Sequence, residues 1–207
     1  FLAPMLGVAA TANALHPFTM GAFFERFIFH HPESIFPMEF VNRITTRKIA
    51  LTKENVLNVL QSSGAIPLVL KGVRDIADAP KGTYHDGGIT DYHMEGEFDS
   101  EDGIVLYPHF MERIIPGWFD KFLPWRKPRK ANLHNMLLLA PSPEFVAKLP
   151  NKKITDRNDF YIYEQDERIR IWEDVAAAGE ALADEFMDGI TKQNVAEKLK
   201  PLEELGR

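Results

Sequence analysis

The chain has 207 residues, of which 45% are hydrophobic and 26% charged, and its formal net charge is -6. This composition excludes a chain that is disordered throughout. Because cysteine is absent, a disulfide scaffold, a thiolate metal site and a cysteine nucleophile are excluded as well. The negative charge argues against nucleic acid as a partner.

The first 31 residues are predicted to be helical and apolar. Phe23, Phe24, Phe27 and Ile28 fit a 3.6-residue period. The stretch 1–15 ends in Ala-Asn-Ala, like a signal-peptide cleavage site, but it lacks the basic residues that begin such peptides. The alternative is a buried helix in a chain that begins inside a domain.

The middle of the chain alternates between candidate strands and helical stretches. A helix is expected over 53–61, with Thr52 as its N-cap and an end at Ser62-Ser63-Gly64. Extended structure is expected at 40–50, 83–85, 104–107 and 136–140. Strands that alternate with helices predict an α/β layered domain.

A helical tail is expected at about 164–206. Trp172, Val175, Leu182 and Phe186 share one face of this segment, and acidic residues lie away from it. Gly189 is expected to end the main helix.

The segment from Tyr84 to His93 carries most of the candidate chemistry. Asp86 is followed by Gly87 and Gly88, which allow a tight turn that could aim the carboxylate at a partner. An Asp-Gly-Gly sequence is also an ordinary hairpin turn. A third interpretation is a metal site that uses the side chains of His85, Asp86, Asp91 and His93, although their spacing fits no familiar zinc motif.

A search for a nucleophile finds none in this chain. There is no Gly-x-Ser-x-Gly elbow, and none of the five serines lies between a buried strand and a helix flanked by glycines. There is also no phosphate-binding loop and no dinucleotide-binding motif. The sequence therefore offers a candidate catalytic carboxylate without its nucleophile.

The segment from Gly117 to Lys130 combines aromatic residues with a basic run. Such a mixture suits peripheral contact with an anionic membrane surface, and the alternative is core aromatics beside a solvated basic loop. The candidate membrane-contact residues are Trp118, Trp125, Arg126, Lys127, Arg129 and Lys130.

Two blocks in fixed order resemble the patatin-like phospholipase family. The first is a helix that runs into Ser62-Ser63-Gly64-Ala65-Ile66-Pro67, and the second is Tyr84-His85-Asp86-Gly87-Gly88, followed by Ile89 and Asp91. The resemblance implies that Asp86 is the aspartate of a Ser-Asp catalytic dyad and that Gly87 and Gly88 form the turn that positions it. In that family, the serine elbow and the glycine-rich oxyanion loop lie N-terminal to the first block.

The resemblance predicts that residues 1–207 form the C-terminal portion of one patatin-like α/β domain, with a mainly parallel central sheet that is incomplete at its N-terminal side. It implies a lipid acyl hydrolase that cleaves lipid esters without a cofactor or metal, and this chain alone is predicted to be inactive. The alternative is a non-catalytic lipid-binding or interaction module. A cytoplasmic or peripheral-membrane location is expected, with exposed apolar surface that promotes homo-oligomers or association with the missing N-terminal portion.

Overall fold

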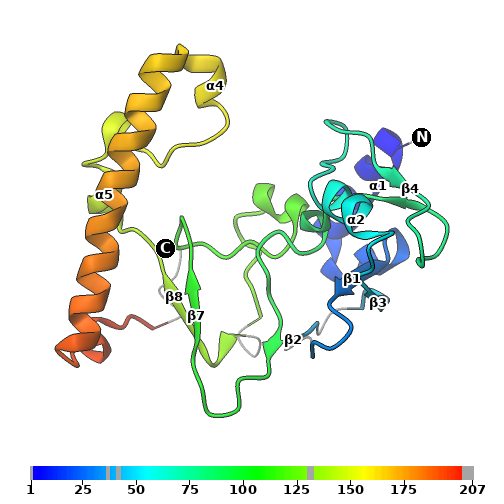
Figure 1. Cartoon of the computed structure of the whole chain (residues 1–207), viewed down its shortest axis with the longest axis horizontal. Helices are drawn as coiled ribbons and strands as arrows, with labels where there is room; N and C mark the ends of the chain where they lie inside the picture. Colours follow the sequence, from blue (N-terminus) through cyan, green and yellow to red (C-terminus); the bar gives the residue numbers. More distant parts are fainter. Residues whose placement is uncertain (1, 36–37, 41–42, 130–132, 202–207) are drawn as a thin grey trace. The chain divides into compact units, whose positions relative to one another are not determined.

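The computed structural model describes residues 2–35, 38–40, 43–129 and 133–201, and it is a mixed α/β structure (Figure 1). By its internal contacts the chain divides into two compact units. The first contains residues 1–105 and 114–135, and the second contains residues 106–113 and 136–207.

The first unit begins with a helix and continues through short strands and turns. Its helical segments are α1 (Leu2–Leu15), η1 (Pro17–Ala22), α2 (Val56–Ser63), η2 (Gly87–Ile89) and η3 (Trp118–Phe122). Its strands are β1 (Arg26–His30), β2 (Met38–Glu39), β3 (Thr46–Ala50), β4 (Val73–Arg74), β5 (Thr83–Tyr84) and β6 (Glu97–Phe98).

The longest ladder of the first unit is the parallel pair β1–β3, in which Arg26 pairs with Thr46 and His30 with Ala50. The prediction of helix through residue 31 is therefore wrong after residue 22. Phe27 and Phe29 lie on the same face of β1. Both rings contact the Tyr84 ring edge-on, at 5.1 and 6.2 Å between centroids. This period of two is typical of a strand.

The core of the first unit lies directly behind the Asp-Gly-Gly turn. Met20, Ile44 and Ile89 are buried together, and Phe24 and Phe119 pack against them. Ile89 ends the short helix η2, so its burial fixes the turn to the core.

The helix α2 starts later than predicted, at Val56, and its N-cap is Asn55. Asn55 is fully buried, and its side-chain amide donates to the Ala50 carbonyl while its oxygen accepts the Thr52 N–H. The predicted end of the helix at Ser63 is confirmed. A short antiparallel pair follows, with Val73 opposite Tyr84 and Arg74 opposite Thr83.

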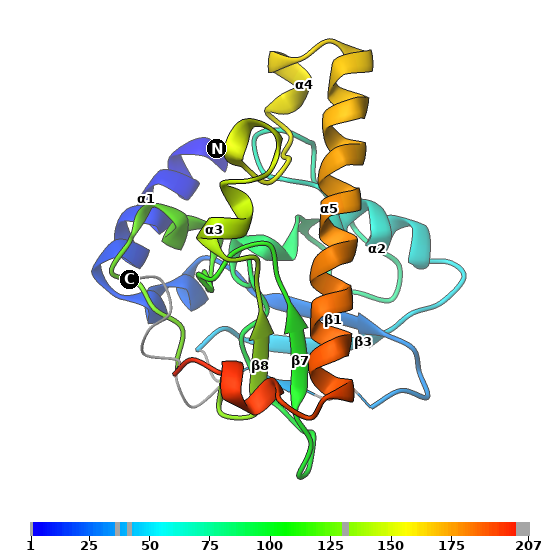
Figure 2. The same cartoon turned by 90° about the vertical axis from the view of Figure 1, so that its left-hand side faces the viewer.

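The second unit combines one ladder with the long C-terminal helix. Its elements are β7 (Val105–Pro108, of which Val105 belongs to the first unit), β8 (Met136–Leu139), α3 (Pro143–Val146), η5 (Pro150–Lys152), α4 (Asp159–Ile162), α5 (Gln165–Thr191) and η6 (Val195–Lys198). The strands β7 and β8 point in the same direction (Figure 2), in agreement with the bonds Val105 N–H to Asn135 and His109 N–H to Leu139.

The long helix of the predicted tail is confirmed at 165–191, but it does not end at Gly189. The helix continues through this buried glycine to Thr191 and is followed by Gln193 with a φ of 55°. Part of the predicted tail, 202–206, lies outside the described residues.

The predicted mixed α/β class is confirmed, whereas the sheets are smaller than expected. The described residues form four two-stranded ladders, β1–β3, β2–β6, β4–β5 and β7–β8, and no continuous central sheet. No helix in the described ranges has both the length and the apolar character needed to cross a bilayer.

Candidate functional site

Asp86 stands at the N-terminus of the short helix η2, directly after strand β5 and His85. Its Oδ1 accepts the Gly88 N–H at 2.8 Å, so the carboxylate caps the turn that follows it. Its own N–H donates to the Ala65 carbonyl at 3.2 Å. The Asp86 backbone is thus held by Ala65, and its carboxylate is held by Gly88.

The other carboxylate oxygen of Asp86 is open. Within the described part of the chain, Oδ2 has no hydrogen-bond or ion-pair partner, and the side chain is only half-buried. A carboxylate with one oxygen fixed and one open can accept a proton from a hydroxyl group that approaches it.

The two glycines after Asp86 play different roles. A Cβ at Gly88 would lie 3.1 Å from Oδ1 of Asp86, so the absence of a side chain there permits the close approach of carboxylate and amide. A Cβ at Gly87 would meet no atom within 4 Å among the described residues, and Gly87 is exposed. Space is therefore free beside the turn.

The two sequence blocks that carry the family resemblance meet at Ala65. This residue is 1% exposed, and its carbonyl accepts both the Asp86 N–H and a bond from Nδ1 of His85, each at 3.2 Å. In the first block, the buried Ser62 hydroxyl donates to the Val59 carbonyl at 2.8 Å, so it caps the helix end.

The side chains of the metal interpretation are not brought together. Asp91 forms a two-point ion pair with Arg26, with both N–O distances at 2.7 Å, and Nδ1 of His93 accepts the Ile115 N–H at 2.8 Å. No cluster of three or more candidate ligands occurs in the described ranges. The metal interpretation therefore finds no support in this geometry.

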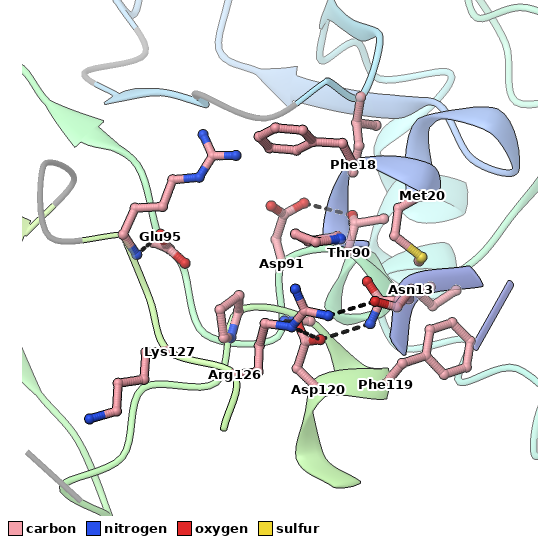
Figure 3. A pocket seen from close by; sticks show the side chains of 16 residues that line it. Asn13, Phe18, Met20, Thr90, Asp91, Glu95, Phe119, Asp120, Arg126 and Lys127 are labelled. Carbon is pink, nitrogen blue, oxygen red and sulfur yellow. Dashed lines mark hydrogen bonds and ion pairs between the residues drawn. The ribbon is translucent and has the colours of Figure 1, made fainter. Parts of the chain in front are cut away.

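A cavity of about 160 Å³ lies in the first unit, beside the residues that follow the Asp-Gly-Gly turn (Figure 3). Ile89, Thr90 and Asp91 line it, whereas Asp86 does not. Its remaining lining residues are Asn13, Pro17, Phe18, Met20, Ile44, Glu95, Pro116, Gly117, Phe119, Asp120, Arg126, Lys127 and Arg129.

The carboxylates around this cavity are already bonded. Asp91 is paired with Arg26 and accepts the Thr90 hydroxyl at 2.7 Å. Asp120 accepts the Asn13 amide at 2.7 Å, faces Nε of Arg126 at 3.3 Å, and accepts the Gly117 N–H at 3.0 Å. Figure 3 shows Asp120, Arg126 and Asn13 turned toward one another. These contacts hold the cavity wall together.

Sequence reasoning did not find these two ion-pair networks. Arg26 and Asp91 are 65 residues apart, and Asn13 and Asp120 are 107 apart. The sequence gives no sign that these charged side chains pair. Arg26 was also predicted to lie in a helix, whereas it begins strand β1.

The candidate membrane-contact residues have unequal environments. Trp125 is 67% exposed and Lys127 is exposed, whereas Trp118 is half-buried. The Arg126 side chain is 14% exposed, is ion-paired with Asp120 and donates to the Asn13 carbonyl at 2.6 Å, so it does not serve as a free surface cation.

The last two basic residues of this group also differ. The guanidinium of Arg129 lies over the Phe18 ring, 4.5 Å from its centroid. Lys130 lies outside the described residues.

Comparison with models of protein families, with curated proteins and with solved structures found no match.

Proposed function

We propose that this protein is a patatin-like lipid acyl hydrolase in which Asp86 accepts the proton of a nucleophilic serine. The observation that carries the proposal is the state of the carboxylate. Oδ1 is held by the Gly88 amide, and Oδ2, on a half-buried side chain, has no partner in the described ranges. A general base needs such a fixed but available oxygen.

The junction of the two sequence blocks supports the same proposal. A chance Asp-Gly-Gly hairpin has no need of the upstream Gly-Ala-Ile-Pro segment. Here the Asp86 N–H bonds to the carbonyl of the buried Ala65 in that segment. The order and contact of the two blocks support a patatin-like arrangement of this segment over an isolated turn.

The proposed reaction proceeds in two steps. The serine oxygen attacks the ester carbonyl carbon while its proton passes to Oδ2 of Asp86, and backbone amides stabilise the oxyanion. The leaving alkoxide takes up the proton as the carbon–oxygen bond breaks. Water then attacks the acyl-serine and gives its proton to Asp86. As the carbon–oxygen bond to serine breaks, Asp86 returns this proton to the serine oxygen and the fatty acid is released.

The serine and the oxyanion amides of this scheme come from outside the 207 residues, because the sequence has no Gly-x-Ser-x-Gly motif. Intact-mass spectrometry before and after treatment with a fluorophosphonate probe tests this requirement on protein purified from its natural source. We expect one covalent adduct on a polypeptide that is heavier than these 207 residues. The absence of an adduct on such protein contradicts the proposal.

The role of Asp86 is tested by Asp86→Asn in protein that reacts with the probe. Turnover of a p-nitrophenyl ester is expected to fall by about 100-fold or more, because asparagine retains the bond to Gly88 but cannot accept a proton. Asp99→Asn, at an exposed position, is the matched control and is expected to retain full turnover. Undiminished turnover in Asp86→Asn contradicts the assignment.

A second candidate function is a lipid-binding module without catalysis. It is favoured by the exposure of Phe122 (77%) and Trp125 (67%), next to the exposed Lys127. Vesicle binding that depends on Trp125, in protein that neither reacts with the probe nor hydrolyses esters, would support it.

A further inference from the structure

An exposed apolar loop follows the first motif block. We call residues Ile66–Lys71 the apolar loop. Leu68, Val69 and Leu70 are 63%, 69% and 56% exposed. Leu68 has a φ of 68°, in the left-handed region that a branched aliphatic side chain seldom adopts. A run of three exposed apolar side chains with such backbone strain is more typical of a contact surface than of a solvated turn.

Both ends of the apolar loop are attached to the segment that presents Asp86. At the N-terminal end, the Ala65 carbonyl accepts the Asp86 N–H. At the C-terminal end, Gly72 lies against the His85 ring, since a Cβ there would be 2.7 Å from Cε1, and Val73 pairs with Tyr84. The position of the loop is therefore set by the same strand and turn that position the carboxylate.

The charged residues within 56–74 are basic, and the exposed Asp75 follows directly after this stretch. From Val56 to Arg74 the sequence contains no aspartate or glutamate, in a chain whose formal net charge is -6. The charged residues of this stretch are Lys71 and Arg74, both exposed. On the preceding helix α2, Leu57 and Leu60 are 76% and 65% exposed.

Apolar side chains next to exposed cations complement an anionic lipid surface, where the apolar groups enter the acyl region and the cations remain at the headgroups. We propose that the apolar loop inserts Leu68, Val69 and Leu70 into an anionic lipid surface, with Lys71 and Arg74 at the headgroups. The inference rests on the proposed function, because it brings the segment that carries Asp86 to the surface where a lipid ester substrate lies.

The segment with Trp118 and Trp125 offers less to a lipid surface. Arg126 is ion-paired with Asp120, and the Arg129 guanidinium lies over the Phe18 ring. The apolar loop therefore replaces that segment as the main contact.

A pair of labelled variants compares the two segments directly. Because the chain contains no cysteine, Val69→Cys and Phe122→Cys each give one site for an environment-sensitive dye. Both original side chains are exposed, at 69% and 77%. With vesicles of phosphatidylcholine and phosphatidylglycerol, the dye at 69 is expected to shift to the blue and the dye at 122 to stay unchanged. A shift at 122 without one at 69 would overturn the proposal.

The contribution to binding is measured by vesicle flotation. Replacement of Leu68, Val69 and Leu70 by serine is expected to lower the partition coefficient at least about tenfold. The double variant Phe122→Ser/Trp125→Ser, which also removes exposed apolar groups, is expected to bind within about twofold of the unchanged protein. Equal binding by the triple variant, or no binding by the unchanged protein, would overturn the loop as the contact.

The cationic part of the proposal is tested with vesicles of phosphatidylcholine alone, to which weaker binding is expected. Equal binding to both compositions would overturn the role of Lys71 and Arg74. If the triple variant fails to fold by circular dichroism, the dye at 69 decides, because that variant changes one exposed residue.

The variant Asp86→Asn separates this inference from the proposed function. It is expected to bind vesicles like the unchanged protein, which supports the loop, and to lose ester turnover. Retained turnover with loop-dependent binding would contradict the dyad and leave the loop supported. Lost turnover with binding that does not depend on the loop would support the dyad and contradict the loop as the contact.

Discussion

Two aspartates of this chain, one in each unit, have opposite environments. Asp159 is fully buried, and its carboxylate is bonded by Nζ of Lys153 at 2.6 Å, Nε1 of Trp172 at 3.0 Å and the Asp156 N–H at 3.0 Å. Asp86 is half-buried, and among the described residues its carboxylate has a single bond, from Gly88.

The difference separates carboxylates that hold the fold from one that is available for chemistry. A buried carboxylate is tolerated only when its oxygens are satisfied. Asp91 and Asp120 follow the same pattern as Asp159, and each has several partners. Asp86 is the exception in this comparison. Its Oδ2, which has no partner among the described residues, is the reason to propose it as the general base.

The largest effect on stability is expected for Asp91→Asn, and the same change at Asp86, five residues earlier, is the comparison. Asp91→Asn leaves the buried Arg26 without its anion and is expected to cost about 3 kcal/mol. Asp86→Asn retains the acceptor for Gly88 and is expected to change the free energy of unfolding by less than about 0.5 kcal/mol. Urea unfolding followed by circular dichroism measures both. Similar losses for the two variants would remove the distinction between bonded and open carboxylates.

A smaller loss is expected for Asp159→Asn in the second unit. It removes the anion that pairs with Lys153, whose side chain is one-third exposed, and weakens the bond from Trp172. We expect a cost of about 2 kcal/mol at neutral pH. Unfolding is followed by the fluorescence of Trp172, in a background with Trp118 and Trp125 replaced by phenylalanine. Asp166→Asn, in the exposed first turn of α5, is the matched control.

The stability from Asp159 is also expected to depend on pH. Burial by itself raises the pKa of the Asp159 carboxyl, but hydrogen bonds from Lys153, the Asp156 amide and Trp172 outweigh it, and the pKa is lowered. Because the folded pKa lies below the unfolded one, near 3.9, the stabilisation is present above that value and is lost as the pH falls through the folded pKa. The difference between Asp159→Asn and the unchanged protein is therefore expected to shrink in acid. A constant difference would contradict the assignment.

The smallest effect concerns the two glycines of the Asp86 turn. Gly88→Ala places a methyl group 3.1 Å from Oδ1 of Asp86 and is expected to cost about 1 kcal/mol. Gly87→Ala meets no atom within 4 Å among the described residues and is expected to be neutral within about 0.5 kcal/mol. Thermal unfolding of the two variants measures the difference. Equal stabilities would show that the carboxylate does not depend on this close approach.

Local patterns predicted the parts of the fold that are determined locally. The end of α2 at Ser63, the strand at Thr83 and the start of β8 at Met136 follow from short-range signals. The 27-residue helix α5 follows from a sustained apolar face. The cap of the Asp86 turn on Gly88 is likewise a contact over two residues.

The parts that the sequence did not predict depend on distant partners. Aromatic residues near Phe27 fit helical spacing as well as strand alternation, and pairing with β3 decides for the strand. The ion pair between Arg126 and Asp120 depends on α1, because Asn13 bonds to both residues. The small separate ladders likewise result from tertiary contacts that no short window of sequence contains.

The sequence separation of these contacts has a consequence for the order in which the first unit assembles. The bond between Asp86 and Ala65 closes a loop of about 20 residues, whereas the bond between Asn13 and Asp120 spans 107. The longer closure costs about 1.4 kcal/mol more chain entropy. We therefore expect the Asp86 turn and the apolar loop to form before the cavity wall closes, and amide hydrogens of the turn to exchange more slowly than those around Asn13 in mild denaturant.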